Sequence, residues 1–426
     1  MRGIFMKTQK NFLSVTLFLF TITIIIGCTG RKSGETSDVE PVKPYPHVIN
    51  MTEGFQNTGQ IKLSDIADSI RYIILSKDKQ LLLGSIRSVQ VTDNNIYLIA
   101  DNLVMRFDHT GRFLNSFGSI GRGPQEYLRG SIYTTTPEDE KIIILRSAMY
   151  SYLSFKPDGD YIGTNDFPVP RTLYSFSCIS DSAFLCTFYY VGSFMKDYIH
   201  NSIDLSAGLF DSEGNQKQAI EHPLKNEIIS KNDITKVISS APTYTFFHNR
   251  IVLSTSGDTI YEVDGKSITK GFIIDWGQIS HMQSVQELYF VQAESANKAY
   301  FSGPLLETYR KAYFRVRKAK DYYIFEYDKS TGKVKSMLLN PDELGFVNDL
   351  DGGSNYYPYW TNRAGDTWIV SDDAYSFKEK HSDEFMATSN ALYPEMKEKL
   401  KTFTKNLKQD DNPILKVVYL KNMKKK

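Results

Sequence analysis

The sequence has little cysteine, no excess of charge of either sign, and none of the common metal or nucleophile motifs. Its three cysteines are Cys28, Cys178 and Cys186, which exclude a disulfide framework. Lys and Arg number 50 against 49 Asp and Glu, so the net charge of +1 gives no overall field to attract nucleic acid. The seven histidines form no His-Glu-x-x-His pair, and no Gly-x-Ser-x-Gly elbow occurs. We therefore expect no metal site, no cofactor, no catalytic motif and no nucleic-acid partner.

Aromatic residues, in contrast, are abundant. Tyr (27) and Phe (26) bring the aromatic share of the 426 residues to 13%. Aromatic and β-branched side chains fit the half-buried face of a strand, so strands should dominate the fold. Cys178 and Cys186 flank a Ser-Asp-Ser turn and could face each other across a hairpin. Because a cross-strand disulfide is geometrically demanding, we favour two packed thiols over a bridge.

The first residues have the pattern of an export signal. Arg2, Lys7 and Lys10 precede an uncharged apolar run over residues 12–26, which ends at Ile-Ile-Gly-Cys28. The run is short for a membrane span, which needs roughly twenty residues. The position of Cys28 resembles the lipobox of bacterial lipoproteins, in which this Cys is acylated after signal cleavage. We expect residues 1–27 to be a lipoprotein signal peptide and Cys28 to be the membrane anchor. The alternative is a plain secretory signal with an incidental Cys.

Residues 28–50 are expected to form a flexible tether, with the folded domain over 51–426. The segment is rich in Ser, Gly, Pro and charge and has no hydrophobic periodicity. Surface-exported lipoproteins of the Bacteroidota often resemble one another in an acidic cluster after the Cys, and here Arg31 and Lys32 stand there instead. This difference favours an outer-membrane anchor that faces the periplasm.

The folded part repeats one unit, which is clearest over residues 96–127. Three short apolar runs (96–100, 103–107 and 112–117) are separated by turn residues, as in sequential antiparallel strands. An aromatic residue followed four or five positions later by Gly recurs at Gly111, Gly159, Gly214, Gly265 and Gly332, which are 48, 55, 51 and 67 residues apart. Each interval holds four strands of the usual length. A sixth, irregular unit surrounds residues 368–370.

The two ends of the repeat region decide between an open stack and a closed ring. Unpaired strands are expected over residues 71–75, before the first unit, and over 413–420, at the end of the chain. If both join the sixth unit, the ring closes without an exposed edge. The sequence therefore predicts an all-β, six-bladed β-propeller of four-stranded antiparallel blades. Short helical insertions are expected over residues 283–298 and 303–312, and an amphipathic helix over 391–407.

Two segments carry a family resemblance. Gly-Ser-Ile-Gly-Arg-Gly-Pro-Gln-Glu-Tyr (118–127), together with Leu-Ser-Asp-Ile-Ala-Asp-Ser-Ile-Arg-Tyr (63–72), resembles the six-bladed β-propeller lipoproteins of gut Bacteroidota. That family typically has Gly where Gln125 stands here. The resemblance is strong over residues 61–155 and architectural thereafter. It implies the fold and little chemistry, because the function of the family is largely unassigned.

Two stretches are candidates for ligand binding. The loop that contains Arg122, Glu126 and Tyr127 lacks the Gly-Lys-Ser/Thr of a P-loop, so we interpret it as a turn between blades. A ligand-facing role for Arg122 and Glu126 at the propeller mouth is the alternative. Asp349 and Asp351 have the spacing of a calcium loop but lack the bidentate Glu, so we interpret them as a turn.

The densest aromatic patch follows at residues 356–360. Its members Tyr357, Tyr359 and Trp360 would stack on a sugar or peptide if they lie on a loop, whereas alternate packing within a strand is the simpler interpretation.

Two functional hypotheses remain. The first is a lipid-anchored module of the cell envelope that binds a glycan, a peptide or a partner protein without catalysis. The alternative is a glycan-active envelope enzyme, a hydrolase or lyase, with carboxylates at the central channel. The membrane, through lipidated Cys28, is the one partner that the residues specify.

Overall fold

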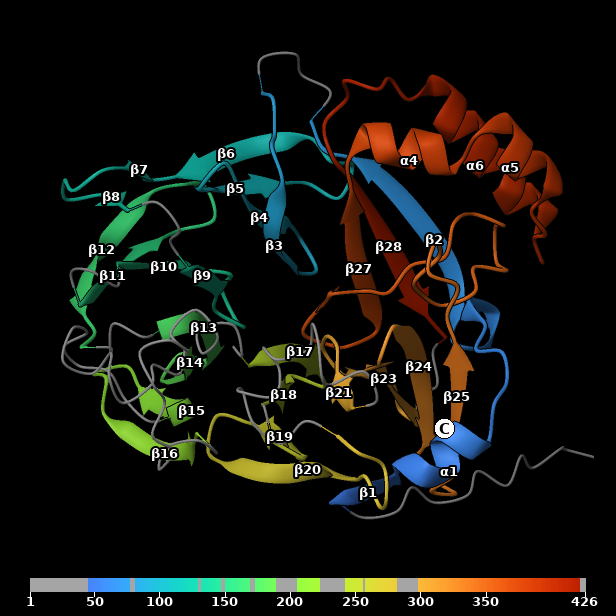
Figure 1. Cartoon of the computed structure of the whole chain (residues 1–426). Helices are drawn as coiled ribbons and strands as arrows, with labels where there is room; N and C mark the ends of the chain where they lie inside the picture. Colours follow the sequence, from blue (N-terminus) through green and yellow to red (C-terminus); the bar gives the residue numbers. More distant parts are fainter. Residues whose placement is uncertain are drawn as a thin grey trace, which may run out of the picture. The chain divides into compact units, whose positions relative to one another are not determined.

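The computed structural model describes residues 45–76, 81–128, 132–146, 150–168, 173–188, 205–222, 242–255, 257–281 and 298–421. The signal peptide, Cys28 and most of the expected tether lie outside these residues. The unit from Pro41 onward is a six-bladed β-propeller (Figure 1). The predicted fold class is therefore confirmed.

Blades one to three are antiparallel sheets whose strands follow chain order from the centre of the ring outward. Blade one contains β3 (Ile86–Val91), β4 (Ile96–Ala100), β5 (Leu103–Phe107) and β6 (Phe113–Phe117). Blade two contains β9 (Ile132–Thr135), β10 (Ile142–Arg146), β11 (Ser151–Phe155) and β12 (Tyr161–Asp166). Blade three contains β13 (Leu173–Ser180), β14 (Ala183–Phe188), β15 (Leu205–Asp211) and β16 (Gln216–Glu221). The short strands β7 (Ser119–Ile120) and β8 (Glu126–Tyr127) pair in parallel between blades one and two.

Blades four to six include strands from both ends of the chain. Blade four contains β17 (Thr243–Phe247), β18 (Arg250–Ser254), β19 (Thr259–Val263), β20 (Ile268–Asp275) and, at its outer edge, β1 (His47–Asn50). Blade five contains β21 (Ala299–Phe301), β22 (Leu306–Glu307), β23 (Lys311–Lys318), β24 (Asp321–Asp328) and β25 (Val334–Leu338). Blade six contains β26 (Trp360–Thr361), β27 (Thr367–Asp372), β28 (Ile414–Leu420) and β2 (Ala67–Ile74).

The ring closes where the sequence predicted. β2 is antiparallel to β28, with Ala67 opposite Leu420 at one end and Ile74 opposite Ile414 at the other. Strand β2, which precedes blade one in the sequence, thus supplies the outer strand of the last blade. We call the junction between blade six and blade one the seam.

The N-terminal residues before β2 also pack on the ring. β1 runs parallel to β20, helix α1 (Met51–Gln56) follows, and a 3-10 helix (Leu63–Asp65) leads into β2. Between them, Thr58 bridges to Ser336 of blade five. The expectation of a tether up to residue 50 was therefore wrong for its last four residues. Residues 47–50 form a strand because they pair with the edge of β20. Nothing within these four residues indicates this pairing, because the partner strand lies far away in the sequence.

The core is a series of hydrophobic clusters, one between each pair of neighbouring blades. Strand β4 shows why both faces of a strand are buried. Tyr97 and Ile99 pack toward blade two, whereas Ile96 and Leu98 pack toward blade six. This alternation follows from the two-residue period of a strand.

The repeated motif of an aromatic residue followed by Gly forms the turn that joins the last two strands, in chain order, of each of blades one to five. Gly111 has a φ of +86°, and a Cβ atom on it would lie 2.2 Å from the carbonyl oxygen of Ile74 in β2. Gly111 is thus required both by its left-handed backbone and by the close approach of blade one to blade six.

Apart from α1, the described α-helices lie in the segment of sequence that connects β27 to β28. They are α4 (Ala374–Lys380), α5 (Asp383–Thr388) and α6 (Pro394–Asn406), and α6 confirms the amphipathic helix predicted over 391–407. Pro394 occupies the first turn, where its missing N–H costs no hydrogen bond. Of the described helices, none is both long and apolar enough to cross a membrane.

The other helical predictions fare differently. A helix over residues 303–312 was wrong, because Leu306 and Glu307 form β22 against β23. The segment 283–297 lies outside the described residues.

Cys178 and Cys186 are buried free thiols, as favoured from the sequence, and each faces a Phe of the neighbouring strand. Burial raises the pKa of the Cys178 thiol to about 12.

Candidate functional site

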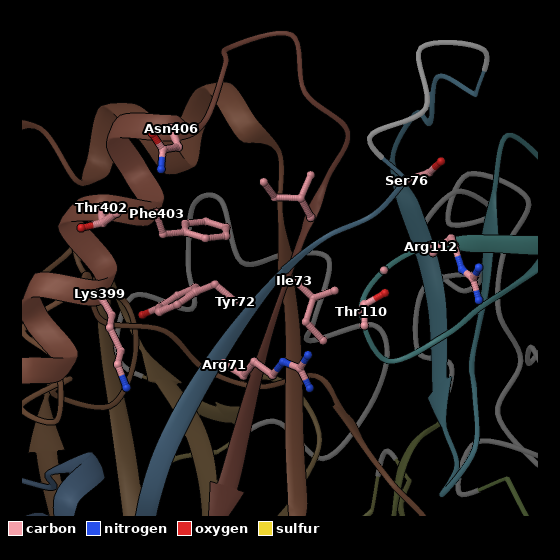
Figure 2. Close-up of a pocket in the computed structure, with 12 residues that line it drawn as sticks. Arg71, Tyr72, Ile73, Ser76, Thr110, Arg112, Lys399, Thr402, Phe403 and Asn406 are labelled. Atoms are coloured by element: carbon pink, nitrogen blue, oxygen red, sulfur yellow. The ribbon is translucent and has the colours of Figure 1, made fainter.

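A cavity of about 670 Å³ lies at the seam, and we call it the seam cavity (Figure 2). Its walls come from β2, from the β5–β6 turn of blade one and from helix α6. The lining residues are Arg71, Tyr72, Ile73, Ile74, Ser76, Thr110, Gly111, Arg112, Lys399, Thr402, Phe403 and Asn406. Three segments that are distant in the sequence thus meet at one site.

Local structure places each wall. In β2, Ile73 packs into the hydrophobic cluster between blade six and blade one, which we call the seam cluster. Arg71 on the same strand is exposed. On α6, lining residues are three, one and three positions apart from Lys399 to Asn406, which puts them on one helical face. The β5–β6 turn is held against the strand by a 2.6 Å hydrogen bond from the Ser76 N–H to the Gly111 carbonyl.

The lining is cationic. Arg71, Arg112 and Lys399 contribute positive charge, and none of the twelve lining residues is acidic. Arg112 is partly neutralised, because its Nε lies 3.0 Å from Oδ2 of Asp108 just outside the cavity. Burial would raise the pKa of Asp108, but hydrogen bonds from Thr110 and Arg112 outweigh it and lower that pKa to about 2. Within the described part of the chain, Arg71 and Lys399 have no carboxylate partner.

A buried polar network supports the floor of the cavity. The Tyr72 hydroxyl donates to Oδ2 of Asp351 at 2.8 Å, and Oδ1 of Asp351 accepts from Asn348 at 2.8 Å and from the Gly353 N–H at 3.0 Å. Burial raises the pKa of Asp351, while the hydrogen bond from Tyr72 opposes that rise. Asp351 therefore holds a turn, as interpreted from the sequence, and it fixes the Tyr72 ring.

A second network fastens the helices to blade six. Lys416 of β28 is 2% exposed and lies 2.6 Å from Oδ2 of Asp372. His381, at the end of α4, donates from Nδ1 to the Phe377 carbonyl at 2.7 Å and accepts at Nε2 from the Ser354 N–H at 3.0 Å. This tautomer follows from the two partners, and it is the neutral ring. Burial, with the charge of Lys416, lowers the pKa of His381 to about 4.

The predicted loop residues lie elsewhere. Oε2 of Glu126 accepts from the Gly123 N–H at 2.7 Å, so this carboxylate stabilises its own loop. Tyr127 is fully buried, and its hydroxyl accepts from the Val104 N–H at 3.0 Å. Arg122 is exposed and forms no ion pair with Glu126. The loop thus acts as a turn between blades, and a ligand-binding role for Arg122 and Glu126 stays a prediction.

The aromatic patch divides into buried and exposed members. Tyr357 is 2% exposed and its hydroxyl donates to the Pro304 carbonyl at 2.8 Å. Tyr359 is 45% exposed, and the Arg315 guanidinium lies between the two rings, 4.5 Å from that of Tyr357 and 5.4 Å from that of Tyr359. Trp360 begins β26 and packs at the edge of the seam cluster. None of the three lines the seam cavity, so their ligand role also stays a prediction.

An arginine occupies the region where the innermost strands end. The Arg363 side chain, which follows β26, donates to the carbonyl oxygens of Thr135 in β9 and, at 2.8 Å, of Cys178 in β13. Its guanidinium also lies 4.9 Å from the ring of Phe246 in β17. Among the described residues, Arg363 thus connects blade six to blades two, three and four with a positively charged side chain. The enzymatic alternative places carboxylates at the central channel.

Sequence reasoning missed the seam cavity. The amphipathic helix over 391–407 was predicted, but Arg71 and Lys399 were not singled out. The sequence offered one signal, the position of two basic residues. Arg71 lies in the first closing segment, and Lys399 lies in the helix that precedes the second. Among the described residues, no group of three or more His, Cys, Asp or Glu side chains is arranged to hold a metal ion.

Two of the solved structures that are similar to this chain come from Bacteroides. One is a protein of Bacteroides fragilis NCTC 9343 whose name assigns it to the exported proteins. It has a TM-score of 0.62 and 16% identity, and the match covers 88% of this chain and 99% of that one. A member of the DUF4221 family from Bacteroides vulgatus ATCC 8482 has a TM-score of 0.45 and 12% identity, over 83% of this chain and 97% of that one. The first of these supports the propeller fold.

No curated protein matches the chain. The family described as "Domain of unknown function (DUF4934)" matches residues 46–419, which is most of the sequence and the whole ring from β1 to β28. The chain belongs to this DUF4934 family.

Proposed function

We propose that the protein is a lipid-anchored binding module of the cell envelope that acts without catalysis, and that the seam cavity is its ligand site. The cavity carries this proposal. Its volume of about 670 Å³ lies within the roughly 300–1,000 Å³ of typical ligand sites, and its lining combines the rings of Tyr72 and Phe403 with polar and charged side chains. Its walls are a strand, a tight turn and a helix, so the side chains are presented on ordered elements.

Two observations support the envelope location. Residues 2–26 have the pattern of an export signal, and Cys28 stands in the position of a lipobox cysteine. The Bacteroides fragilis protein of the same fold is named as an exported one. Lipidation of Cys28 would supply the membrane anchor, and the basic residues Arg31 and Lys32 favour the periplasmic face of the outer membrane. The ligand would be a glycan, a peptide or a partner protein.

The experiment separates binding from turnover. Purified residues 29–426 are incubated with a panel of polysaccharides, glycosides and peptides, and both complex formation and product release are measured. Binding without product release is the expected result. Product release would replace this function with the enzymatic alternative.

A pair of matched variants tests whether the cavity is the site. Thr402→Trp places an indole in the cavity and should abolish binding. Thr388→Trp places the same side chain at an exposed position of α5, outside the cavity lining, and should leave binding unchanged. Equal binding by both variants would show that the site lies elsewhere.

A further inference from the structure

The chemistry of the lining allows the ligand class to be narrowed. We propose that the seam cavity recognises an acidic saccharide, whose carboxylate or sulfate groups are held by Arg71 and by Lys399 and whose ring lies against Phe403. This inference rests on the proposed function, because it assumes that the cavity is the ligand site.

The charge of the lining calls for an anion. Arg71 projects from β2 and Lys399 from α6, and neither has a carboxylate partner in the part of the chain that the structure describes (Figure 2). The planar guanidinium of Arg71 can hold a carboxylate or sulfate through two parallel hydrogen bonds. Buried Lys416 and Arg250, in contrast, each have carboxylate partners inside the protein. The charges of Arg71 and Lys399 are therefore not neutralised within the described protein and are available to an anionic ligand.

The aromatic floor calls for a flat, partly apolar ligand. The Phe403 and Tyr72 rings lie together where α6 meets β2, with centroids 5.5 Å apart (Figure 2). The orientation of the Tyr72 ring is fixed, because its hydroxyl donates a hydrogen bond to Asp351 and its ring packs against Phe377. A rigid aromatic surface of this kind presents an apolar face with little loss of side-chain entropy on binding.

The balance of donors and acceptors favours a saccharide over a peptide. Among the polar groups without a described partner in the cavity, the Arg71 guanidinium and the Lys399 ammonium only donate, and the Asn406 amide can both donate and accept. A peptide brings one N–H donor with almost every residue, and each needs an acceptor. An acidic sugar presents ring, carboxylate or sulfate oxygens as acceptors, and each of its hydroxyl groups can accept as well as donate, whereas a peptide N–H can only donate. The lining thus complements the sugar better.

Four polymers separate the determinants of binding. Polygalacturonate and dextran sulfate carry anionic groups on sugar rings, dextran is a neutral sugar polymer, and polyglutamate is an acidic polypeptide. Residues 29–426 should bind the first two at least tenfold more tightly than the last two, and that binding should weaken as salt is added. Comparable binding of dextran would overturn the anionic assignment, and comparable binding of polyglutamate would overturn the saccharide assignment. Failure of both acidic sugars to bind would overturn both.

Neutral variants on one helix provide the matched test. Lys399→Gln should weaken polygalacturonate binding about tenfold, and Arg71→Gln should do the same, because each removes a charge-assisted hydrogen bond. Lys401→Gln, on the same helix but outside the lining, should leave binding unchanged. Thermal unfolding of each variant confirms that the ring is intact. Equal affinities for all three variants would contradict the proposed contacts.

The outcome for the ligand class is distinguishable from that for the site. If Thr402→Trp blocks a neutral sugar or a peptide, the cavity remains the site and the acidic saccharide is wrong. If Thr402→Trp changes no binding at all, the proposed site itself fails.

Discussion

The Tyr72 hydroxyl lies 2.8 Å from Oδ2 of Asp351, and this hydrogen bond joins the strand that closes the ring to the loop that leads into blade six. Tyr72 also lines the seam cavity, so one residue belongs to the closure, to the helical cover and to the candidate site. The ligand site and the integrity of the ring are therefore physically coupled. A ligand that binds only the closed ring must stabilise it.

Removal of the Tyr72 hydroxyl should destabilise the ring. In Tyr72→Phe, buried Asp351 loses one of its three described donors, and an unsatisfied buried acceptor costs about 1–3 kcal/mol. Denaturant unfolding should show a loss of that size. Tyr419→Phe, on the neighbouring strand β28, removes a hydroxyl from a side chain that is 37% exposed and should change stability by less than about 0.5 kcal/mol. Equal effects of the two variants would contradict the role given to Asp351.

Gly111 should tolerate no side chain. In Gly111→Ala, the methyl group meets the Ile74 carbonyl and the residue must keep a φ of +86°, so we expect a loss of roughly 2 kcal/mol or more in unfolding free energy. Gly163 in β12 is the matched control, because a Cβ atom there meets nothing within 4 Å. Gly163→Ala should be neutral or slightly stabilising. If Gly111→Ala is as stable as Gly163→Ala, the close contact between blades one and six is wrong.

Stability should depend on the protonation of His381. Its pKa in the folded chain is about 4, below the ordinary value near 6.5, so the unfolded chain binds more protons between these values. The stability contributed by the neutral ring is present above about pH 6.5 and is lost as the pH falls toward 4, by roughly 2–3 kcal/mol. In His381→Gln this loss should disappear. The test is the unfolding free energy of both proteins at about pH 7.5 and pH 4.5, and parallel losses would contradict the assignment.

The membrane anchor is testable through Cys28. With labelled palmitate, cells that produce the full chain should incorporate label into the protein and retain it in the membrane fraction. Cys28→Ser should carry no label, whereas Ser33→Ala, five residues further along the tether, should be labelled like the wild type. Label on the Cys28→Ser protein would remove the anchor from this account.

The ring was accessible from the sequence because its signals are local. The continuous apolar run of β4 and the glycine turn at Gly111 are each set by residues close together in the sequence. The closure of β2 on β28 was inferred because each segment had strand character and lacked a partner within its own repeat. These features require no knowledge of which surfaces meet in space.

The cavity was not accessible for the opposite reason. Arg71, Thr110 and Lys399 lie in separate segments, and only the packing of α6 over the seam brings them together. Strand β1 escaped notice in the same way, because its pairing depends on the free edge of β20. The exposed Tyr359 shows the limit of composition, since the nearby Tyr357 in the same patch is buried in the core.

A crystal structure of residues 29–426 with a galacturonate trisaccharide tests the central claim most directly. The account predicts the sugar in the seam cavity, with carboxylates against Arg71 and Lys399 and a ring on Phe403. A sugar bound at Arg122 or Tyr359 instead, with the seam cavity empty, would contradict it.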